Sequence, residues 1–172
     1  MYRHIFLTLI ALSMSCNLDA QEFGTSVSIH DKGKETYYVE GFIAGLGSVD
    51  FLVDTGSSYM TINEEALEVL KTQNQVRYVK ELIGIMADGS SKQVPVYLIE
   101  QVTLGSQCTL NDVEAAVLPA KTRYILGLSA LKKASPFAIH TEPLPKLVLS
   151  HCGTEDLENK VKKTAEPEAS TV

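Results

Sequence analysis

Positive charge is scarce in this sequence. Among 172 residues, 15 Lys and Arg stand against 21 Asp and Glu, which gives a formal net charge of −6. Proteins that bind nucleic acid carry a basic patch or stripe. The lysines here gather only in two short clusters, at 132–133 and 160–163, which are more simply solvated surface. We therefore expect no nucleic-acid partner.

Apolar runs long enough to cross a bilayer are also missing. The run IFLTLIALSM at 5–14 is too short for a spanning helix. It follows Arg3 and leads through polar residues to Ala20, which predicts a signal peptide at 1–20 and a periplasmic or secreted protein of the bacterial envelope. The alternative is a lipoprotein anchored at Cys16. Lipoprotein sites carry a leucine three residues before the cysteine, whereas Leu12 lies four residues before Cys16. A membrane is a partner only in that second case.

Cysteine and histidine are few, with three and four residues. Removal of residues 1–20 leaves Cys108 and Cys152, an even number in an oxidising compartment, which permits one disulfide. Two buried thiols are the alternative. The histidines show no ligand spacing beyond the adjacent pair His151 and Cys152, so we expect no metal and no other cofactor.

The length and hydrophobic content suit one domain. A chain of 172 residues that is 45% hydrophobic can form one compact core but scarcely two. Short β-prone runs alternate with turns, which predicts a mainly β domain at 25–152. The segment 153–172 is rich in charge and poor in apolar residues, which predicts a disordered polar tail.

One clear helix interrupts the strands. Asn63 can cap it, and Glu64 and Glu65 fall in its first turn. Its expected apolar face, which should cover the sheet, consists of Ala66, Leu67, Val69 and Leu70. A second, short helix is expected at SALKKA, residues 129–134.

A long hairpin is predicted further along the chain. VRYVKELIGIM at 76–86 and KQVPVYLIEQVTL at 92–104 flank the turn ADGSS. Such a tip is free to move.

The stretch FLVDTGSSYMTI at 51–62 carries the main functional signal. Asp54 ends an apolar strand, where a charge is costly to desolvate unless hydrogen bonds or a functional need hold it there. A glycine and two serines then turn the chain before it resumes as a β-prone segment.

These motifs resemble the retropepsin-like aspartic proteases of the single-domain bacterial kind that carry a signal peptide, across roughly residues 36–150. The resemblance rests on FLVDTGSS as the active-site loop, ELIGIMADGSSKQVPVYL as the flap, VTLG and VEAAVLP as central strands, and YILGLSAL as the segment that packs behind the loop. It implies a retropepsin-like half-barrel with a flap hairpin and one or two short helices, working as a C2 homodimer. The residues expected to bind substrate on the flap are Ala87, Asp88, Gly89 and Ser90.

The resemblance also implies an aspartic endopeptidase that acts on proteins or peptides. Asp54 would be catalytic, and Thr55 would brace the loop of a partner chain. Gly56 would let its amide approach the carboxylate. Ser57 would donate its hydroxyl to the outer oxygen of Asp54, stabilise the ionised form and so tune the pair toward an acidic optimum.

This chemistry needs two carboxyl groups, one to take a proton from water and one to give a proton to the amide. The sequence has one such triplet, and YILGLS, the segment that mirrors it, has no aspartate. Asp88 and Asp112 lie outside that context. Asp54 must therefore pair with Asp54 of a second chain, which a C2 dimer permits. The alternatives are a catalytically inactive binding module with the same fold, and an envelope lipoprotein.

Overall fold

The computed structural model describes residues 24–33 and 36–152. The predicted signal peptide at 1–20, Cys16 within it, and the predicted polar tail at 153–172 all lie outside the described residues. Within the described ranges, no helix is both long enough and apolar enough to cross a membrane.

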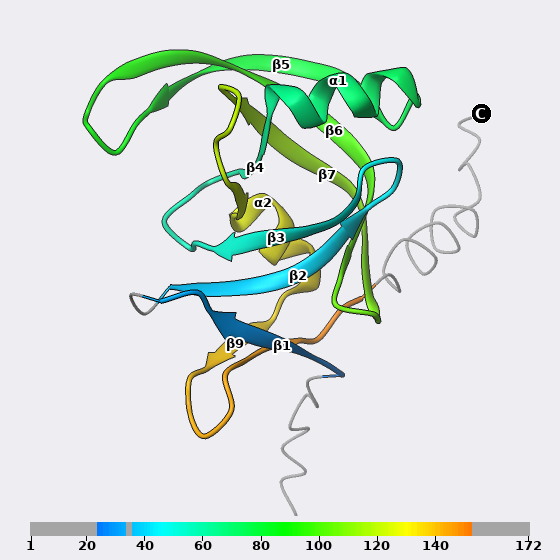
Figure 1. Ribbon diagram of the computed structural model, residues 1–172, viewed down its shortest axis with the longest axis vertical. Helices are drawn as coiled ribbons and strands as arrows, with labels where there is room; N and C mark the ends of the chain where they lie inside the picture. Colours follow the sequence, from blue (N-terminus) through cyan, green and yellow to red (C-terminus); the bar gives the residue numbers. More distant parts are fainter. Residues whose placement is uncertain (1–23, 34–35, 153–172) are drawn as a thin grey trace, which may run out of the picture.

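The described chain consists mostly of strands (Figure 1). In chain order the elements are β1 (Thr25–Asp31), β2 (Tyr37–Ile43), β3 (Gly47–Val53), β4 (Met60–Asn63), α1 (Glu64–Thr72), β5 (Val76–Ile85), β6 (Ser91–Leu104), β7 (Cys108–Leu118), β8 (Tyr124–Leu126), α2 (Leu128–Leu131), the 3-10 helix η1 (Lys132–Ala134), β9 (Phe137–His140) and β10 (Lys146–Leu149). The expected mainly β class, with one clear helix and a short second one, is confirmed.

Part of the sheet closes into a barrel. The strand order is β5-β6-β7-β4-β8-β3-β2-β1-β10-β9, and a further pairing of β6 with β2 joins the two ends of the run from β6 to β2. In that pairing Gly41 lies opposite Leu104, and Ile43 lies opposite Val102. The 14 residues of β6 let it pair with β5, β7 and β2 along its length.

The interior of the barrel holds the inward-facing side chains of its strands. In β2, Val39 and Ile43 are fully buried while Glu40 and Phe42 are exposed, which is the alternation of a strand with one face on the core. The largest fully buried side chains of the domain are Phe51, Ile43, Met60, Ile62, Leu70, Ile99, Leu104, Leu110, Leu126, Leu131, Leu147 and Leu149.

Helix α1 begins where the sequence predicts. The Asn63 side chain accepts a hydrogen bond from the amide of Ala66 at 2.9 Å and so caps the helix. Ala66, Leu67 and Leu70 are buried, as expected. Val69 is a correction, because it is 39% exposed and lies outside the buried face.

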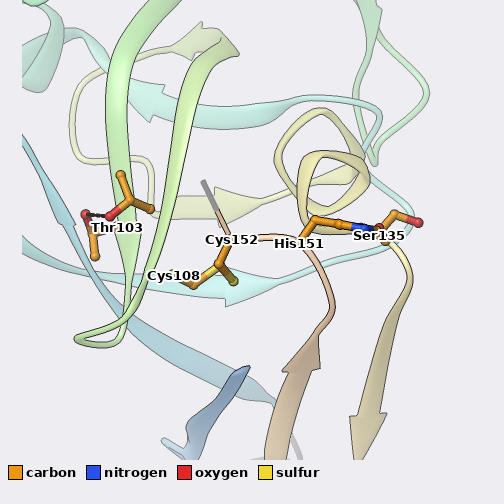
Figure 2. The surroundings of a disulfide bond; sticks show 6 residues. Thr103, Cys108, Ser135, His151 and Cys152 are labelled. Atoms are coloured by element: carbon orange, nitrogen blue, oxygen red, sulfur yellow. Dashed lines mark hydrogen bonds between the residues drawn. A yellow bond between two sulfur atoms is a disulfide. The ribbon is translucent and has the colours of Figure 1, made fainter. Parts of the chain in front are cut away.

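A disulfide joins Cys108, at the start of β7, to Cys152, beyond the end of β10 (Figure 2). The two Cα atoms lie 4.6 Å apart, and the bridge spans a sequence separation of 44 residues. Of the two alternatives for these cysteines, the structure has the bridged form. Beside it, Nδ1 of His151 contacts the carbonyl of Ser135. The bridge therefore ties the chain after β10 to the barrel.

We expect the double substitution Cys108→Ser with Cys152→Ser to lower the free energy of unfolding by about 3 to 4 kcal/mol, because the bridge restricts the unfolded chain over a long loop. This corresponds to a fall in Tm of roughly 10 °C. Calorimetry of both forms, with and without reductant, measures it. Reductant should lower the Tm of the wild type and leave that of the double variant unchanged. An equal Tm for the two forms would contradict the expectation.

The loop between β3 and β4 rests on the segment that follows β8. The amides of Leu128 and Ser129 donate to the carbonyls of Ser57 and Ser58 at 2.9 and 3.0 Å. These bonds hold the middle of the loop against the beginning of α2. The expected packing of YILGLSAL behind FLVDTGSS is thus present in the structure.

Gly127 is required at this contact for steric reasons. A Cβ at this position would lie 2.1 Å from the carbonyl oxygen of Tyr59 and 2.9 Å from that of Ser57. Its φ of −93° suits any residue, so the obstacle is the neighbouring backbone alone. The loop can approach α2 this closely only because residue 127 has no side chain.

Gly127→Ala should destabilise the domain by about 1 to 3 kcal/mol, the usual cost of overpacking. Gly24→Ala is the matched control, since a Cβ there would lie 3.8 Å from its nearest neighbour, the Ser150 carbonyl oxygen. Chemical denaturation of both variants measures the difference. Equal stability of the two variants would show that the loop moves away from residue 127 at no cost.

Candidate active site

Asp54 lies where strand β3 ends. β3 pairs in parallel with β8, with Val53 opposite Leu126. The next amide, that of Asp54, donates to the carbonyl of Leu126 at 3.2 Å, so the parallel pairing continues as far as the aspartate. Its side chain is partly exposed. The carboxylate can therefore meet water while its backbone is held.

The turn after Asp54 orients the carboxylate. The amide of Gly56 donates to Oδ1 of Asp54 at 2.9 Å, and the amide of Ser57 donates to the Asp54 carbonyl at 3.3 Å. A Cβ at position 56 would lie only 3.2 Å from Oδ1, so glycine allows the amide to approach. Thr55 and Gly56 are themselves exposed beside the carboxylate.

Ser57 differs from the expectation based on the sequence. Its hydroxyl donates to the carbonyl of Tyr59 at 2.7 Å. A hydroxyl has a single proton to donate, so the hydrogen bond expected from Ser57 to Asp54 is replaced by one within the turn. The acidic optimum that rested on that bond has no support in this geometry.

Asp54 lines a groove of about 770 Å³ between its own loop and strand β5. The lining residues are Asp54, Gly56, Ser57, Ser58, Tyr59, Thr61, Leu82, Ile83, Gly84, Ile85, Met86, Ala87, Val94, Ala116, Leu118 and Ile125. Among these described residues, Asp54 alone carries a carboxylate, and most of the others are apolar. The groove thus combines one acid–base group with walls suited to apolar side chains.

Strands β5 and β6 form a long hairpin (Figure 1), and residues of this hairpin line one wall of the groove. The hairpin ends in a hydrogen-bonded turn. The amide of Met86 donates to the Ser90 carbonyl at 2.8 Å, and the amide of Gly89 donates to the Met86 carbonyl at 2.9 Å. The hydroxyl and amide of Ser90 donate to Oδ1 of Asp88 at 2.6 and 2.9 Å, and they hold the pKa of Asp88 below its ordinary value. Gly89 adopts a φ of +81°, which favours glycine.

The four residues predicted to bind substrate on the flap divide between two places. Ala87 lines the groove, whereas Asp88, Gly89 and Ser90 lie in the turn at the tip and are not among the lining residues.

The stretch at 82–86 also lines the groove, and sequence reasoning did not predict it. The sequence signal that could have found it is the number of apolar residues in β5. In the structure, Ile83 and Ile85 of this strand are 73% and 79% exposed, and exposed apolar surface of this kind marks a binding groove or an interface.

Ser129 is a further residue that sequence reasoning missed. Its hydroxyl accepts a hydrogen bond from the amide of Met60 at 2.7 Å and donates to the carbonyl of Glu114 at 2.6 Å. It therefore links the end of the Asp54 loop to strand β7. A lone serine in a helical pattern has no sequence signal for such a role.

Comparison with known proteins agrees with this geometry. The model of the family described as gag-polyprotein putative aspartyl protease matches residues 39–133. No curated protein matches the chain. Among solved structures, a retropepsin-like aspartic protease from Rickettsia conorii is similar in fold, with 21% sequence identity, a TM-score of 0.51, and coverage of 72% of this chain and 89% of that one. Because the family match spans more than half of the 172 residues, the chain belongs to the gag-polyprotein putative aspartyl protease family, and its fold is retropepsin-like.

Proposed function

We propose that the protein is an aspartic endopeptidase in which two Asp54 carboxylates, one from each chain of a homodimer, activate a water molecule. The observation that carries the proposal is the carboxylate itself. It is held by the Gly56 amide at 2.9 Å and opens onto an apolar groove of about 770 Å³. Family membership supports the same chemistry.

A second chain is needed because one chain supplies one carboxylate to the groove. The other aspartates of the described residues, Asp31, Asp50, Asp88 and Asp112, are absent from its lining. A two-fold axis beside Asp54 would bring the same loop together twice. The exposure of Thr55 beside the carboxylate and of Ile83 and Ile85 on the hairpin supports a partner at this face.

In the proposed reaction the two carboxyl groups share one proton, as aspartic proteases do in general. The ionised Asp54 takes a proton from water, whose oxygen bonds to the carbonyl carbon of the peptide. The protonated Asp54 of the other chain donates its proton toward the amide. The C–N bond then breaks, and the products are a carboxylic acid and an amine.

The substrate is proposed to be an extended protein or peptide segment with apolar side chains beside the cut. The support is the groove wall, where Leu82, Met86 and Val94 come from the hairpin and Leu118 and Ile125 come from the barrel. Burial of apolar side chains against such walls would provide most of the binding free energy.

We also propose that the protein works in the periplasm or outside the cell. The signal-peptide pattern at 1–20 supports this. The disulfide between Cys108 and Cys152 supports it independently, because structural disulfides persist in oxidising compartments. Anchoring through lipid on Cys16 is the minority alternative.

Asp54→Asn should abolish peptide cleavage while the fold stays intact, because it removes the acid–base group from both halves of the site. The measurement is the cleavage of a peptide library by residues 21–172 at several pH values, with circular dichroism as the control for folding. Undiminished cleavage by the Asn variant would refute the assignment. Wild-type protein that binds peptides without cleaving them would instead indicate the binding module.

Mixing tests the shared site directly. When wild-type protein re-equilibrates with an equal amount of the Asp54→Asn variant, mixed dimers form and the activity should fall to roughly half. Dilution of the wild type should also lower its specific activity, because the dimer dissociates. An enzyme that worked as a monomer would keep its full activity in both experiments.

A further inference from the structure

Tyr59 lies at the junction of the Asp54 loop and strand β4, and it lines the same groove as Asp54. Its backbone is fixed, because its carbonyl accepts the hydroxyl of Ser57 at 2.7 Å and packs against Gly127. Its side chain is half-buried. A large side chain on so rigid a support can shape the binding groove, provided that something also holds its ring.

A cation lies over the ring, from the strand whose later residues line the opposite wall. Nζ of Lys80, on strand β5, lies 5.4 Å from the centroid of the Tyr59 ring, within the range of a cation–π contact. The same Nζ lies 2.9 Å from Oε2 of Glu114 on strand β7. The Glu114 carboxylate, and to a smaller extent the Tyr59 hydroxyl, raise the pKa of Lys80 above its ordinary value. The Lys80 ammonium therefore contacts both the Tyr59 ring and the Glu114 carboxylate.

This contact connects both walls of the groove. Lys80 lies on β5, two residues before Leu82, where the strand begins to line the groove. Glu114 lies on β7, and its own carbonyl accepts the hydroxyl of Ser129. The position of the Tyr59 ring is thus set jointly by the hairpin and the barrel.

We propose that Tyr59 is a specificity-determining residue of the groove, and that Lys80, oriented by Glu114, is the positioning residue that holds its ring. The ring forms one side of a subsite for a large apolar side chain of the peptide substrate. This inference rests on the proposed function, because it assigns a role within the same groove.

A second cluster in the same domain provides a matched control. Nζ of Lys71 lies 5.5 Å from the centroid of the Tyr97 ring and 3.0 Å from Oε1 of Glu68. Its chemistry repeats that of the Lys80 cluster, yet Tyr97 is not among the residues that line the groove. Any effect that is common to Lys71→Met and Lys80→Met is therefore structural and not specific to the groove.

The test uses fluorescent peptides in which each position in turn carries Leu, Phe, Ala or Ser. Tyr59→Ala should reduce the ratio of kcat/KM for large over small side chains at one position by roughly tenfold, the scale of losing an apolar subsite wall. Lys80→Met should reduce the same ratio by about two- to fivefold, the scale of a partly exposed cation–π contact. Tyr59→Phe, Lys80→Arg and Lys71→Met should keep the ratio of the wild type, because Arg can still pair with Glu114 and stack on the ring.

A second arm measures the binding of the same peptides by fluorescence anisotropy, with Tyr59 and Lys80 substituted in the Asp54→Asn background. An order of peptide preference that is unchanged in Tyr59→Ala overturns the inference. So does an equal effect of Lys71→Met and Lys80→Met, and so does failure of every peptide to bind. A wild-type protein that cleaves no peptide would overturn the proposed function alone, since the binding arm still decides the role of Tyr59.

Discussion

The site depends on one close contact between two backbones. The loop from Asp54 to Tyr59 lies directly against Gly127, the residue between β8 and α2, where a side chain would meet the Tyr59 carbonyl at 2.1 Å. Around this contact, the Asp54 amide bonds to Leu126, and Ser129 bonds to Met60 across a sequence separation of 69 residues. These bonds satisfy the backbone around Asp54, while its carboxylate is partly exposed and accepts the Gly56 amide.

The closed barrel is what makes this contact possible. The pairing of β6 with β2 joins the ends of the run from β6 to β2, and within it β8 lies between β3 and β4. The parallel register of β3 with β8 sets where the Asp54 loop begins. The hairpin of β5 and β6 extends from the same sheet (Figure 1), and its residues line the other wall of the groove. The rigid core thereby determines the position of both walls.

The groove has an uneven distribution of polar groups. Its walls are mostly apolar, the Asp54 carboxylate lies in the loop that forms one of them, and the Lys80–Glu114 pair adjoins it at Tyr59. Under the proposed function, a second chain would bring a second carboxylate to the first, and the apolar walls would hold the peptide between the two. The exposed Ile83 and Ile85 side chains lie on the wall that such an assembly would cover.

The sequence by itself determined the local features, because they depend on residues that are neighbours in the chain. The strand that ends at Asp54, the Asn63 cap and the hairpin with its turn at Gly89 were predictable from such local patterns. The pairing of YILGLSAL with the Asp54 loop joins distant segments, and it was predictable only from the family resemblance. Only the tertiary structure decided that the Ser57 hydroxyl bonds to Tyr59, that Leu82 to Met86 line the groove while residues 88–90 of the tip do not, and that Lys80 lies over the Tyr59 ring. Each of these depends on the distance and direction between side chains of separate segments or on competing acceptors within one turn, and a one-dimensional pattern does not contain that information.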